Sequence, residues 1–296
     1  MSLIGLDVGG TTMKAAITEG SEVVASESWP TNREDPVGGI IDFAAHLAGR
    51  ASSLGSPARA AGIVVPGIVD ESTGTAVHSA NLGWRDAPIL RLAQERLGIP
   101  VALGHDVRTG GLAEAVLGAG RDADDFVFMA IGTGIAAALI IGNTPYPGVA
   151  GWSGEIGHVV VRPGGEDCAC GNKGCLETYA SAAAISRRYG EAVPAEEVIA
   201  RAGRSDEKAK QVWSDALDTL ADGLAATTLL MDPGLIVIGG GLAQAGETLL
   251  APLATRLTDR LNFRPPPALV LSDLDDQAAV KGATILAHRL TQDGHR

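Results

Sequence analysis

The fold is decided by the stretch Leu3-Ile-Gly-Leu-Asp-Val-Gly-Gly-Thr-Thr-Met-Lys-Ala-Ala-Ile-Thr-Glu-Gly20, which predicts a strand, a Gly/Thr turn, a second strand and a polar turn. A later stretch can be laid over it without a gap, at an offset of 123 residues: Phe126-Val-Phe-Met-Ala-Ile-Gly-Thr-Gly-Ile-Ala-Ala-Ala-Leu-Ile-Ile-Gly-Asn143. An internal duplication explains this match, and it predicts two similar folds within one chain.

The two copies differ in charge. Asp7 of the first copy is aligned with Ala130 of the second, and Lys14 is aligned with Ala137. Because only one copy keeps the charged groups, we expect a single site in the cleft between the two folds.

Composition limits the class of protein. The 296 residues are 46% hydrophobic, which suffices for two domains with substantial cores. The net charge of −12 disfavours nucleic acid and anionic membranes as partners, because both require a cationic face. No apolar run reaches the roughly 18 residues that span a bilayer, and the first residues do not form a signal peptide. With all the cysteines clustered, we expect a cytoplasmic protein with reduced thiolates.

The first glycine turn carries phosphate-binding chemistry. Consecutive glycines let a ligand approach the backbone closely, and amides, hydroxyls and an ammonium group can bind phosphate oxygens. The residues that offer these groups are Gly9, Gly10, Thr11, Thr12 and Lys14. Asp7 can hold Mg²⁺ at the end of the strand. An ordinary tight hairpin is the alternative, and the pattern is not that of a Walker loop.

Two further glycine turns are weaker candidates. The turn formed by Gly132, Thr133 and Gly134 gains support from the repeat, which would aim both turns at one phosphate chain. Gly239, Gly240 and Gly241 follow an apolar strand and precede a helix. That turn can seat a nucleotide or can simply pack a strand on a helix.

A metal site is indicated by four residues within eighteen positions: His158, Cys168, Cys170 and Cys175. Three thiolates and one imidazole complete the tetrahedral ligand set of structural zinc. Redox-reactive cysteines are the competing interpretation, which this spacing does not require. The flanking carboxylates of Glu155 and Glu177 are not needed to neutralise the metal, so the loop presents them to something else.

Asp106 follows a short strand and precedes a helix. A helix cap is the ordinary role for this residue. Its position at the carboxyl end of a strand also suits a carboxylate that takes a proton from an attacking hydroxyl. Asn81 lies in a turn whose composition says little about function.

Helices are expected at 42–54, 87–97, 107–117, 180–189, 207–231 and 277–290, and strands at 61–65, 101–103, 235–238 and 268–272. For the helix at 87–97 we expect Asp86 as the N-cap and Gly98 as the stop.

These motifs join into one pattern along the chain: Leu6-Asp-Val-Gly-Gly-Thr-Thr-Met-Lys14, Pro66-Gly67-Ile-Val-Asp70, Asn81, Asp106, Gly132-Thr-Gly134, Glu155-Ile-Gly-His158 and Cys168-Ala-Cys-Gly-Asn-Lys-Gly-Cys-Leu-Glu177. The pattern resembles the ROK family (repressor, open reading frame, kinase), and in particular its zinc-containing bacterial ATP-dependent glucokinases. The resemblance implies an α/β, actin-like ATPase (ribonuclease-H-like) fold of two duplicated domains around a cleft. We expect a small domain of residues 1–118 plus the C-terminal helix 280–296, and a large domain of residues 119–279 with the zinc loop.

The resemblance also implies an activity, the transfer of phosphate from MgATP to the 6-hydroxyl of a hexose, with glucose as the first choice. Asp106 would be the base. Ring hydroxyls would be bound by Asn81, Glu155, His158 and Glu177, with the backbone near Gly67 lining the pocket. The three glycine turns would bind ATP, and the protein would be a homodimer or homotetramer.

One residue departs from the family pattern. The residue before the base is usually Asn and contacts the sugar, whereas here it is His105. The exchange alters the donor and acceptor pattern, so the sequence leaves the hexose open. The alternatives are a kinase for another hexose or an N-acetylated amino sugar such as N-acetylmannosamine, a non-catalytic sugar-responsive regulator, and a polyphosphate-dependent enzyme.

Overall fold

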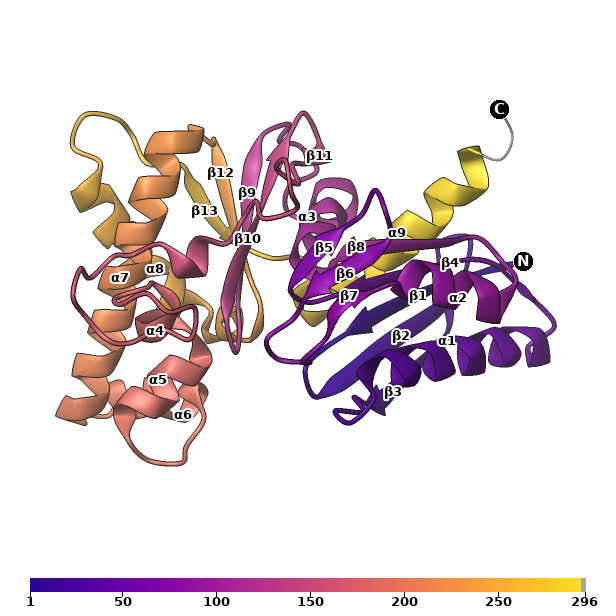
Figure 1. The fold of residues 1–296 in the computed structure, drawn as a ribbon. Helices are drawn as coiled ribbons and strands as arrows, with labels where there is room; N and C mark the ends of the chain where they lie inside the picture. The colour runs from indigo at the N-terminus through magenta and orange to yellow at the C-terminus, as the bar shows by residue number, and fades with distance from the viewer. Residues whose placement is uncertain (294–296) are drawn as a thin grey trace. The chain divides into compact units, whose positions relative to one another are not determined.

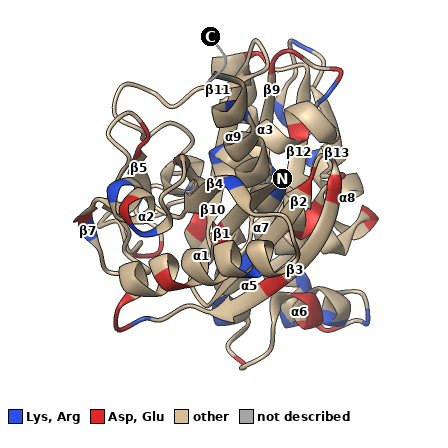
Figure 2. Ribbon diagram, turned by 90° about the vertical axis from the view of Figure 1, so that its right-hand side faces the viewer, with Lys and Arg blue, Asp and Glu red and all other residues tan. Residues whose placement is uncertain are grey.

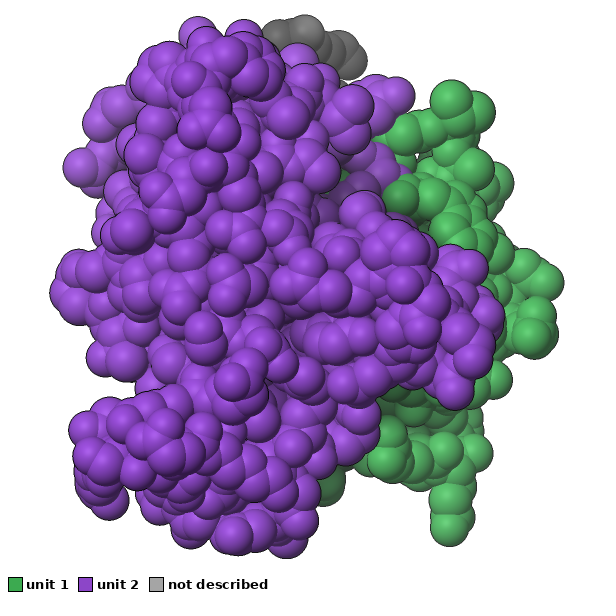
Figure 3. Space-filling model, turned by 90° about the vertical axis from the view of Figure 1, so that its left-hand side faces the viewer, with its two compact units in different colours: residues 1–113, 147–152, 277–296 green, residues 114–146, 153–276 purple. Residues whose placement is uncertain are grey.

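The structure is a computed structural model that describes residues 1–293, and the chain divides into two compact units (Figure 3). Unit 1 comprises Met1–Ala113, Pro147–Trp152 and the chain from Gln277 onward. Unit 2 comprises Glu114–Tyr146 and Ser153–Asp276. The end of the predicted C-terminal helix segment, residues 294–296, lies outside the described residues.

Unit 1 is built on a five-stranded sheet with the order β3-β2-β1-β4-β8 (Figure 1). Its strands are β1 (Ser2–Val8), β2 (Thr12–Glu19), β3 (Glu22–Pro30), β4 (Ala58–Val65) and β8 (Val101–His105). The helices that accompany them are α1 (Pro36–Ser53), α2 (Ile89–Leu97), α3 (Asp106–Leu117), which continues into unit 2, and α9 (Ala278–Asp293). β1 and β2 are antiparallel, whereas β4 and β8 run parallel to β1.

The two faces of this sheet are covered differently. Bulky side chains such as Ile4 and Ile63 pack in one cluster with Phe43 of α1. Toward α9 the sheet presents glycines instead. A Cβ on Gly62 would lie 1.9 Å from a carbonyl oxygen of α9, and one on Gly5 would lie 2.6 Å from another. Small residues therefore let α9 pack directly on the strand backbones.

A small antiparallel sheet of β5 (Ile68–Asp70), β6 (Thr75–His78) and β7 (Arg85–Ala87) was not expected from the sequence. It corrects the predicted start of the next helix. Asp86 is not an N-cap: it lies in β7 with φ of 48°, and α2 begins at Ile89. Pro88 explains the difference, because the residue before a proline is disfavoured in the helical region. Gly98 ends the helix in the left-handed conformation, as predicted.

Unit 2 repeats the plan of unit 1. Its sheet has the order β11-β10-β9-β12-β13, with the same sequence of antiparallel and parallel pairs. The strands are β9 (Phe126–Ile131), β10 (Ile135–Ile141), β11 (Thr144–Pro145), β12 (Leu235–Gly239) and β13 (Ala268–Leu271). The helical segments are η1 (Ile156–His158), α4 (Glu177–Ala180), α5 (Ala182–Tyr189), α6 (Ala195–Ala202), α7 (Glu207–Met231), η2 (Gly241–Ala245), α8 (Glu247–Arg260) and η3 (Asp275–Gln277). The predicted duplication is confirmed.

The register of the repeat corrects one part of the alignment. Val8 pairs with Met13 across the first turn, whereas Ile131 pairs with Ile135 across the second, which is one residue shorter. Asp7 lies opposite Lys14, and Ala130 lies opposite Ala136. The counterpart of Lys14 is therefore Ala136 and not Ala137, because a shift of one residue moves a side chain to the other face of the sheet.

Along the ribbon of Figure 2, Lys and Arg positions are interspersed with Asp and Glu positions. The chain as a whole carries a net charge of −12. Among residues 1–293, no helix has both the length and the apolar character needed to cross a membrane.

Candidate active site

The first glycine turn joins β1 to β2. The Gly9 amide donates to the Thr12 carbonyl oxygen at 3.0 Å, and the Thr31 hydroxyl donates to the Gly9 carbonyl at 2.7 Å. A Cβ on Gly9 would lie 2.5 Å from that Thr12 oxygen, whereas one on Gly10 would meet nothing within 4 Å. Thr11 and Thr12 are exposed. The turn is therefore fixed from inside and open outside, as phosphate binding requires.

The second glycine turn is held by a carboxylate from the cysteine loop. Gly132 donates its amide proton to the Gly134 carbonyl at 2.9 Å, and Ile135 donates to Glu177 Oε2 at 2.8 Å. A Cβ on Gly134 would lie 2.6 Å from the same Glu177 oxygen. Thr133 at the tip is exposed. One oxygen of Glu177 therefore supports the turn, while the sequence predicted this residue only as a sugar ligand.

The third glycine turn lies between β12 and η2. Gly240 has φ of 80°, and its Cβ would lie 2.5 Å from the Ile131 carbonyl oxygen, so it packs strand on strand. Gly241 has open space around it and borders a cavity of about 350 Å³. Ile199, Ala200 and Leu242 line this cavity together with the polar residues Glu196, Gln244 and Thr248. The turn thus has a packing glycine followed by one beside a space for a ligand.

The predicted metal ligands come together in unit 2. The donor atoms of His158, Cys168, Cys170 and Cys175 all lie within 4.8 Å of one another. Cys170 Sγ lies 3.7 Å from Cys175 Sγ, and Cys168 Sγ lies 3.7 Å from His158 Nδ1. Two thiolates each about 2.3 Å from one tetrahedral zinc ion would lie about 3.8 Å apart. The donor set and its spacing therefore fit zinc.

The thiols are also packed in a way that favours a cation. Burial, together with the neighbouring thiols of Cys168 and Cys170, raises the pKa of Cys175 to about 12. Crowded thiolates repel one another without a positive charge among them. A bound zinc ion would supply that charge and would fix the loop.

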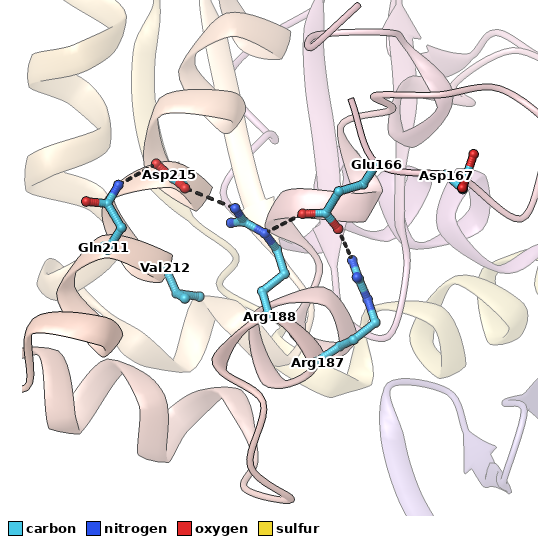
Figure 4. Close-up of a pocket in the computed structure, with 7 residues that line it drawn as sticks. All are labelled: Glu166, Asp167, Arg187, Arg188, Gln211, Val212 and Asp215. Carbon is cyan, nitrogen blue, oxygen red and sulfur yellow. Dashed lines mark hydrogen bonds and ion pairs between the residues drawn. The ribbon is translucent and has the colours of Figure 1, made fainter. Parts of the chain in front are cut away.

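Ion pairs anchor the cysteine loop to α5 and α7. Glu166, two residues before Cys168, forms ion pairs with Arg187 and Arg188, and Arg188 also donates a hydrogen bond to Asp215 (Figure 4). These side chains line a wide cavity of about 630 Å³. No predicted sugar ligand lines this cavity, and its arginines are committed to carboxylates. We interpret it as the outer side of the loop anchor and not as the substrate site.

The position of Glu155 depends on the preceding residue, Gly154, where any side chain would be strained. Gly154 has φ of 95°, and a Cβ there would lie 1.8 Å from the Ala137 carbonyl oxygen. The Ala137 amide in turn donates to the Gly154 carbonyl at 2.8 Å. Glu155 then lies 3.8 Å from His158 Nε2. His158 therefore has Nδ1 toward the thiols and Nε2 toward a carboxylate, the arrangement that orients metal-bound imidazoles.

In unit 1, Asp106 is the first residue of α3, directly after β8. Its Oδ1 accepts a hydrogen bond from the Val107 amide at 2.7 Å, and a quarter of its side-chain surface (25%) stays exposed. Burial raises the pKa of Asp106 to about 6, against the opposing effects of the Val107 amide and the Arg108 charge. A carboxylate with this pKa is ionised at neutral pH and is a stronger base than an ordinary Asp.

His105 is buried beside this carboxylate, with 5% of its surface exposed. Burial, and next the charge of Arg108, lowers the pKa of His105 to about 3, so the ring is neutral. Its Nδ1 accepts a hydrogen bond from the Arg108 amide at 3.2 Å. The sequence identified His105 but missed Arg108 and Glu71, which surround it. The only signal for Arg108 was its i+3 position from His105 at a helix start.

Two other predicted sugar residues lie in the same unit. Gly67 has φ of 94°, and a Cβ there would lie 2.2 Å from the His78 carbonyl oxygen, so the turn requires glycine. Asn81 is exposed in a turn closed by the Gly83 amide and the Ser79 carbonyl at 2.8 Å. Its backbone carbonyl accepts a hydrogen bond from Arg33 at 3.4 Å.

The candidate residues thus fall on both units. Unit 1 holds Asp7, the first glycine turn, Gly67, Asn81, His105 and Asp106, whereas unit 2 holds the other two glycine turns, the metal cluster, Glu155 and Glu177.

The family model named ROK family matches residues 3–290. The chain belongs to the ROK family. It is 35% identical over 279 residues to a glucokinase of Halalkalibacterium halodurans, covering 84% of this chain and 83% of that protein. The crystal structure of a ROK hexokinase from Thermus thermophilus matches with a TM-score of 0.85 and 30% identity, over 99% of this chain and 100% of that chain.

A ROK family glucokinase from Streptomyces griseus in complex with glucose and AMPPNP also matches, with a TM-score of 0.85 and 28% identity, over 98% of this chain and 100% of that chain. The resemblance to ROK glucokinases and the predicted fold of two duplicated actin-like domains are confirmed.

Proposed function

We propose that this ROK protein is an ATP-dependent hexokinase that transfers the γ-phosphoryl group of ATP to the 6-hydroxyl of glucose. The observation that carries the proposal is Asp106, a carboxylate at the start of α3 that is largely enclosed yet reachable from solvent. Its raised pKa suits a group that must accept a proton near neutral pH. The similarity to a glucokinase and to a ROK hexokinase supports the same reaction.

In this mechanism Asp106 accepts the proton of the 6-hydroxyl as the oxygen bonds to phosphorus. Phosphoryl transfer has a loose transition state, so proton removal comes late and most of the catalysis is positioning. Asp7 would hold Mg²⁺, which neutralises phosphate charge when bound. The exposed Thr11 and Thr12 of the first turn and the tip of the second would bind phosphate oxygens.

The residues that would bind the sugar are Gly67, Asn81, His105, Glu155, His158 and Glu177. Zinc on the cysteine loop would hold Glu155 and Glu177 in place through His158 and the loop end. The adenine base would occupy the cavity beside Gly241, against Ile199 and Ala200. We expect a cytoplasmic homodimer or homotetramer, and light scattering of the purified protein measures its mass.

The reaction is tested by coupled ADP release with a panel of hexoses and N-acetylated amino sugars. We expect glucose to give the highest kcat/KM, and Asp106→Asn to lower kcat at least 10³-fold with folding intact. Near-normal kcat in that variant would remove Asp106 from the mechanism. Absence of ADP release with every sugar would favour the regulator alternative.

The cavity beside Gly241 has its own test. Ala200→Phe would fill it, so we expect KM for ATP to rise at least tenfold while KM for the sugar stays within twofold. An unchanged KM for ATP would show that the adenine base does not bind in this cavity. Another hexose or an amino sugar remains the second candidate substrate, because His105 stands where the family usually has Asn.

A further inference from the structure

Arg108 is a buried arginine that joins three separate segments of unit 1. Only 2% of its surface is exposed. Its Nη1 donates to the Gly151 carbonyl at 2.9 Å, its Nη2 donates to the Val69 carbonyl at 3.4 Å, and Nε and Nη2 both donate to Glu71 Oε1, at 3.2 and 3.0 Å. A planar guanidinium with several acceptors is held in one orientation.

Glu71 completes the arrangement from the other side. The oxygen that binds the Arg108 guanidinium also accepts the backbone N–H of His105, at 3.3 Å. Arg108 and Glu71 therefore hold the junction of β8 and α3, where His105 and Asp106 lie, against the hairpin that starts at β5. Arg108 also holds Gly151, part of the short segment Pro147–Trp152 that belongs to unit 1. Gly151 has φ of 77°, and a Cβ there would lie 2.5 Å from the Val69 carbonyl oxygen, so this contact is close.

The same residue fixes the chemistry of the His105 ring. Because the Arg108 amide donates to Nδ1 of His105, that nitrogen must carry a lone pair and not a proton. The proton of the neutral ring is then on Nε2, which can only donate. A carboxamide offers both a donor and an acceptor, so the ring is the more selective group.

We propose that Arg108 and Glu71 are positioning residues for sugar phosphorylation: they hold the His105–Asp106 junction in one geometry and make His105 a hydrogen-bond donor toward the sugar. The inference rests on the proposed function, because it assigns Asp106 as the base. Neither residue touches the reacting atoms in this assignment. Both act through His105 and Asp106.

The charged groups around Asp106 determine how its pKa should respond to substitution. Arg108 is the cation that lowers the pKa of Asp106, and Glu71 is the anion paired with it. Asp70, next to Glu71, directs its carboxylate to Ser72 and Thr73. On α9, Gly282 packs against Thr109 of α3, and the neighbouring Lys281 is exposed. The segment Pro147–Trp152 has no ionisable side chain.

The experiment is the pH profile of kcat/KM for Arg108→Met, Arg108→Lys and Glu71→Gln in the full chain. The acid limb is the fall in kcat/KM at low pH, where Asp106 becomes protonated. Arg108→Met removes the cation and should move this limb to higher pH by at least 0.5, whereas Glu71→Gln removes the anion and should move it to lower pH. Arg108→Lys should keep the acid limb at its wild-type pH, because lysine retains the positive charge. It should not restore the full kcat, because lysine lacks the planar set of N–H donors of the guanidinium. We expect kcat of Arg108→Met to fall at least tenfold.

A matched pair of controls lies in the same unit. Arg91 and Glu95 on α2 form an ion pair of 2.8 Å whose side chains are 61% and 59% exposed. Arg91→Met and Glu95→Gln should leave kcat and the acid limb unchanged. If Arg108→Met and Glu71→Gln lose kcat but keep the wild-type limb, the pair is merely structural and the proposal is overturned.

A second measurement keeps the proposal testable if Arg108→Met does not fold. In protein labelled with ¹⁵N-histidine, His105 should show the Nε2–H tautomer by NMR in the wild type, and an Nδ1–H signal would overturn the proposal. Failure of the proposed function itself is recognised separately, because Asp106→Asn would then retain turnover.

Discussion

The raised pKa of Asp106 predicts that this carboxylate, the proposed catalytic base, lowers the free energy of unfolding at neutral and alkaline pH. A carboxyl group whose pKa is about 6 in the folded chain, against the usual 3.8, binds protons more tightly when folded. Between these two values the folded state holds more protons than the unfolded state, so the free energy of unfolding falls as pH rises. The loss is complete above about pH 7 and absent below about pH 4.

The magnitude follows from the same two values. Their difference corresponds to about 3 kcal/mol at 1.36 kcal/mol per pH unit. With 25% of the side chain exposed, part of this cost is screened, and we expect about 2 kcal/mol. Asp106→Asn removes the charge and keeps an oxygen for the Val107 amide. It should therefore raise Tm by about 4–8 °C at pH 8, using about 2–4 °C per kcal/mol for a chain of this size.

The assay is calorimetry of the ligand-free protein at pH 8 and at pH 5. The Tm advantage of Asp106→Asn should be large at pH 8 and should shrink at pH 5, while Asp42→Asn, an exposed position on α1, follows the wild type. The reasoning is refuted if Asp106→Asn is no more stable than the wild type at pH 8, or if the difference is the same at both pH values.

Three further predictions concern unit 2. Cys170→Ser removes one thiolate, so zinc measured by mass spectrometry should fall below one per chain and KM for the sugar should rise. Gly154→Ala should lower the free energy of unfolding in urea by about 2 kcal/mol or more, because its Cβ would lie 1.8 Å from a carbonyl oxygen. The control Gly142→Ala, with φ of 55° and open space around it, should lower it by about 1 kcal/mol. Glu114→Gln should cost about 1–3 kcal/mol, since this buried carboxylate accepts from the Ser272 hydroxyl and the Ala119 and Leu274 amides; a cost under 0.5 kcal/mol would contradict this.

The sequence was most informative where local chemistry determines structure. The repeat predicted two sheets of equal plan, and α7 was predicted with the bounds that the structure has, Glu207–Met231. The cysteine spacing predicted a ligand cluster that the structure assembles. In each case the signal comes from residues close together in the chain, where periodicity and short turns leave few alternatives.

The sequence was least informative where a tertiary contact decides. Glu71 and Arg108 are 37 residues apart, and no periodicity connects an acidic turn residue to a helical arginine. Asp86 has the composition of an N-cap, yet Pro88 moved the helix start and a short strand took its place. The ungapped alignment of the repeat failed at the turn, because the hydrophobic pattern of Ala136 and Ala137 fits either register.

The carboxylate near the glycine turn comes from a different element in each copy. In the first copy the carboxylate near the glycine turn is Asp7, on the strand itself. In the second copy that strand position is Ala130, and the carboxylate at the turn is Glu177, whose Oε2 binds the Ile135 amide and touches Gly134. Glu177 follows Cys175 by two residues, so its position depends on the cysteine cluster. A residue beside the predicted zinc ligands thus supplies the carboxylate at the second turn, and zinc bound to the cysteine cluster would be connected to this turn through the Glu177 side chain.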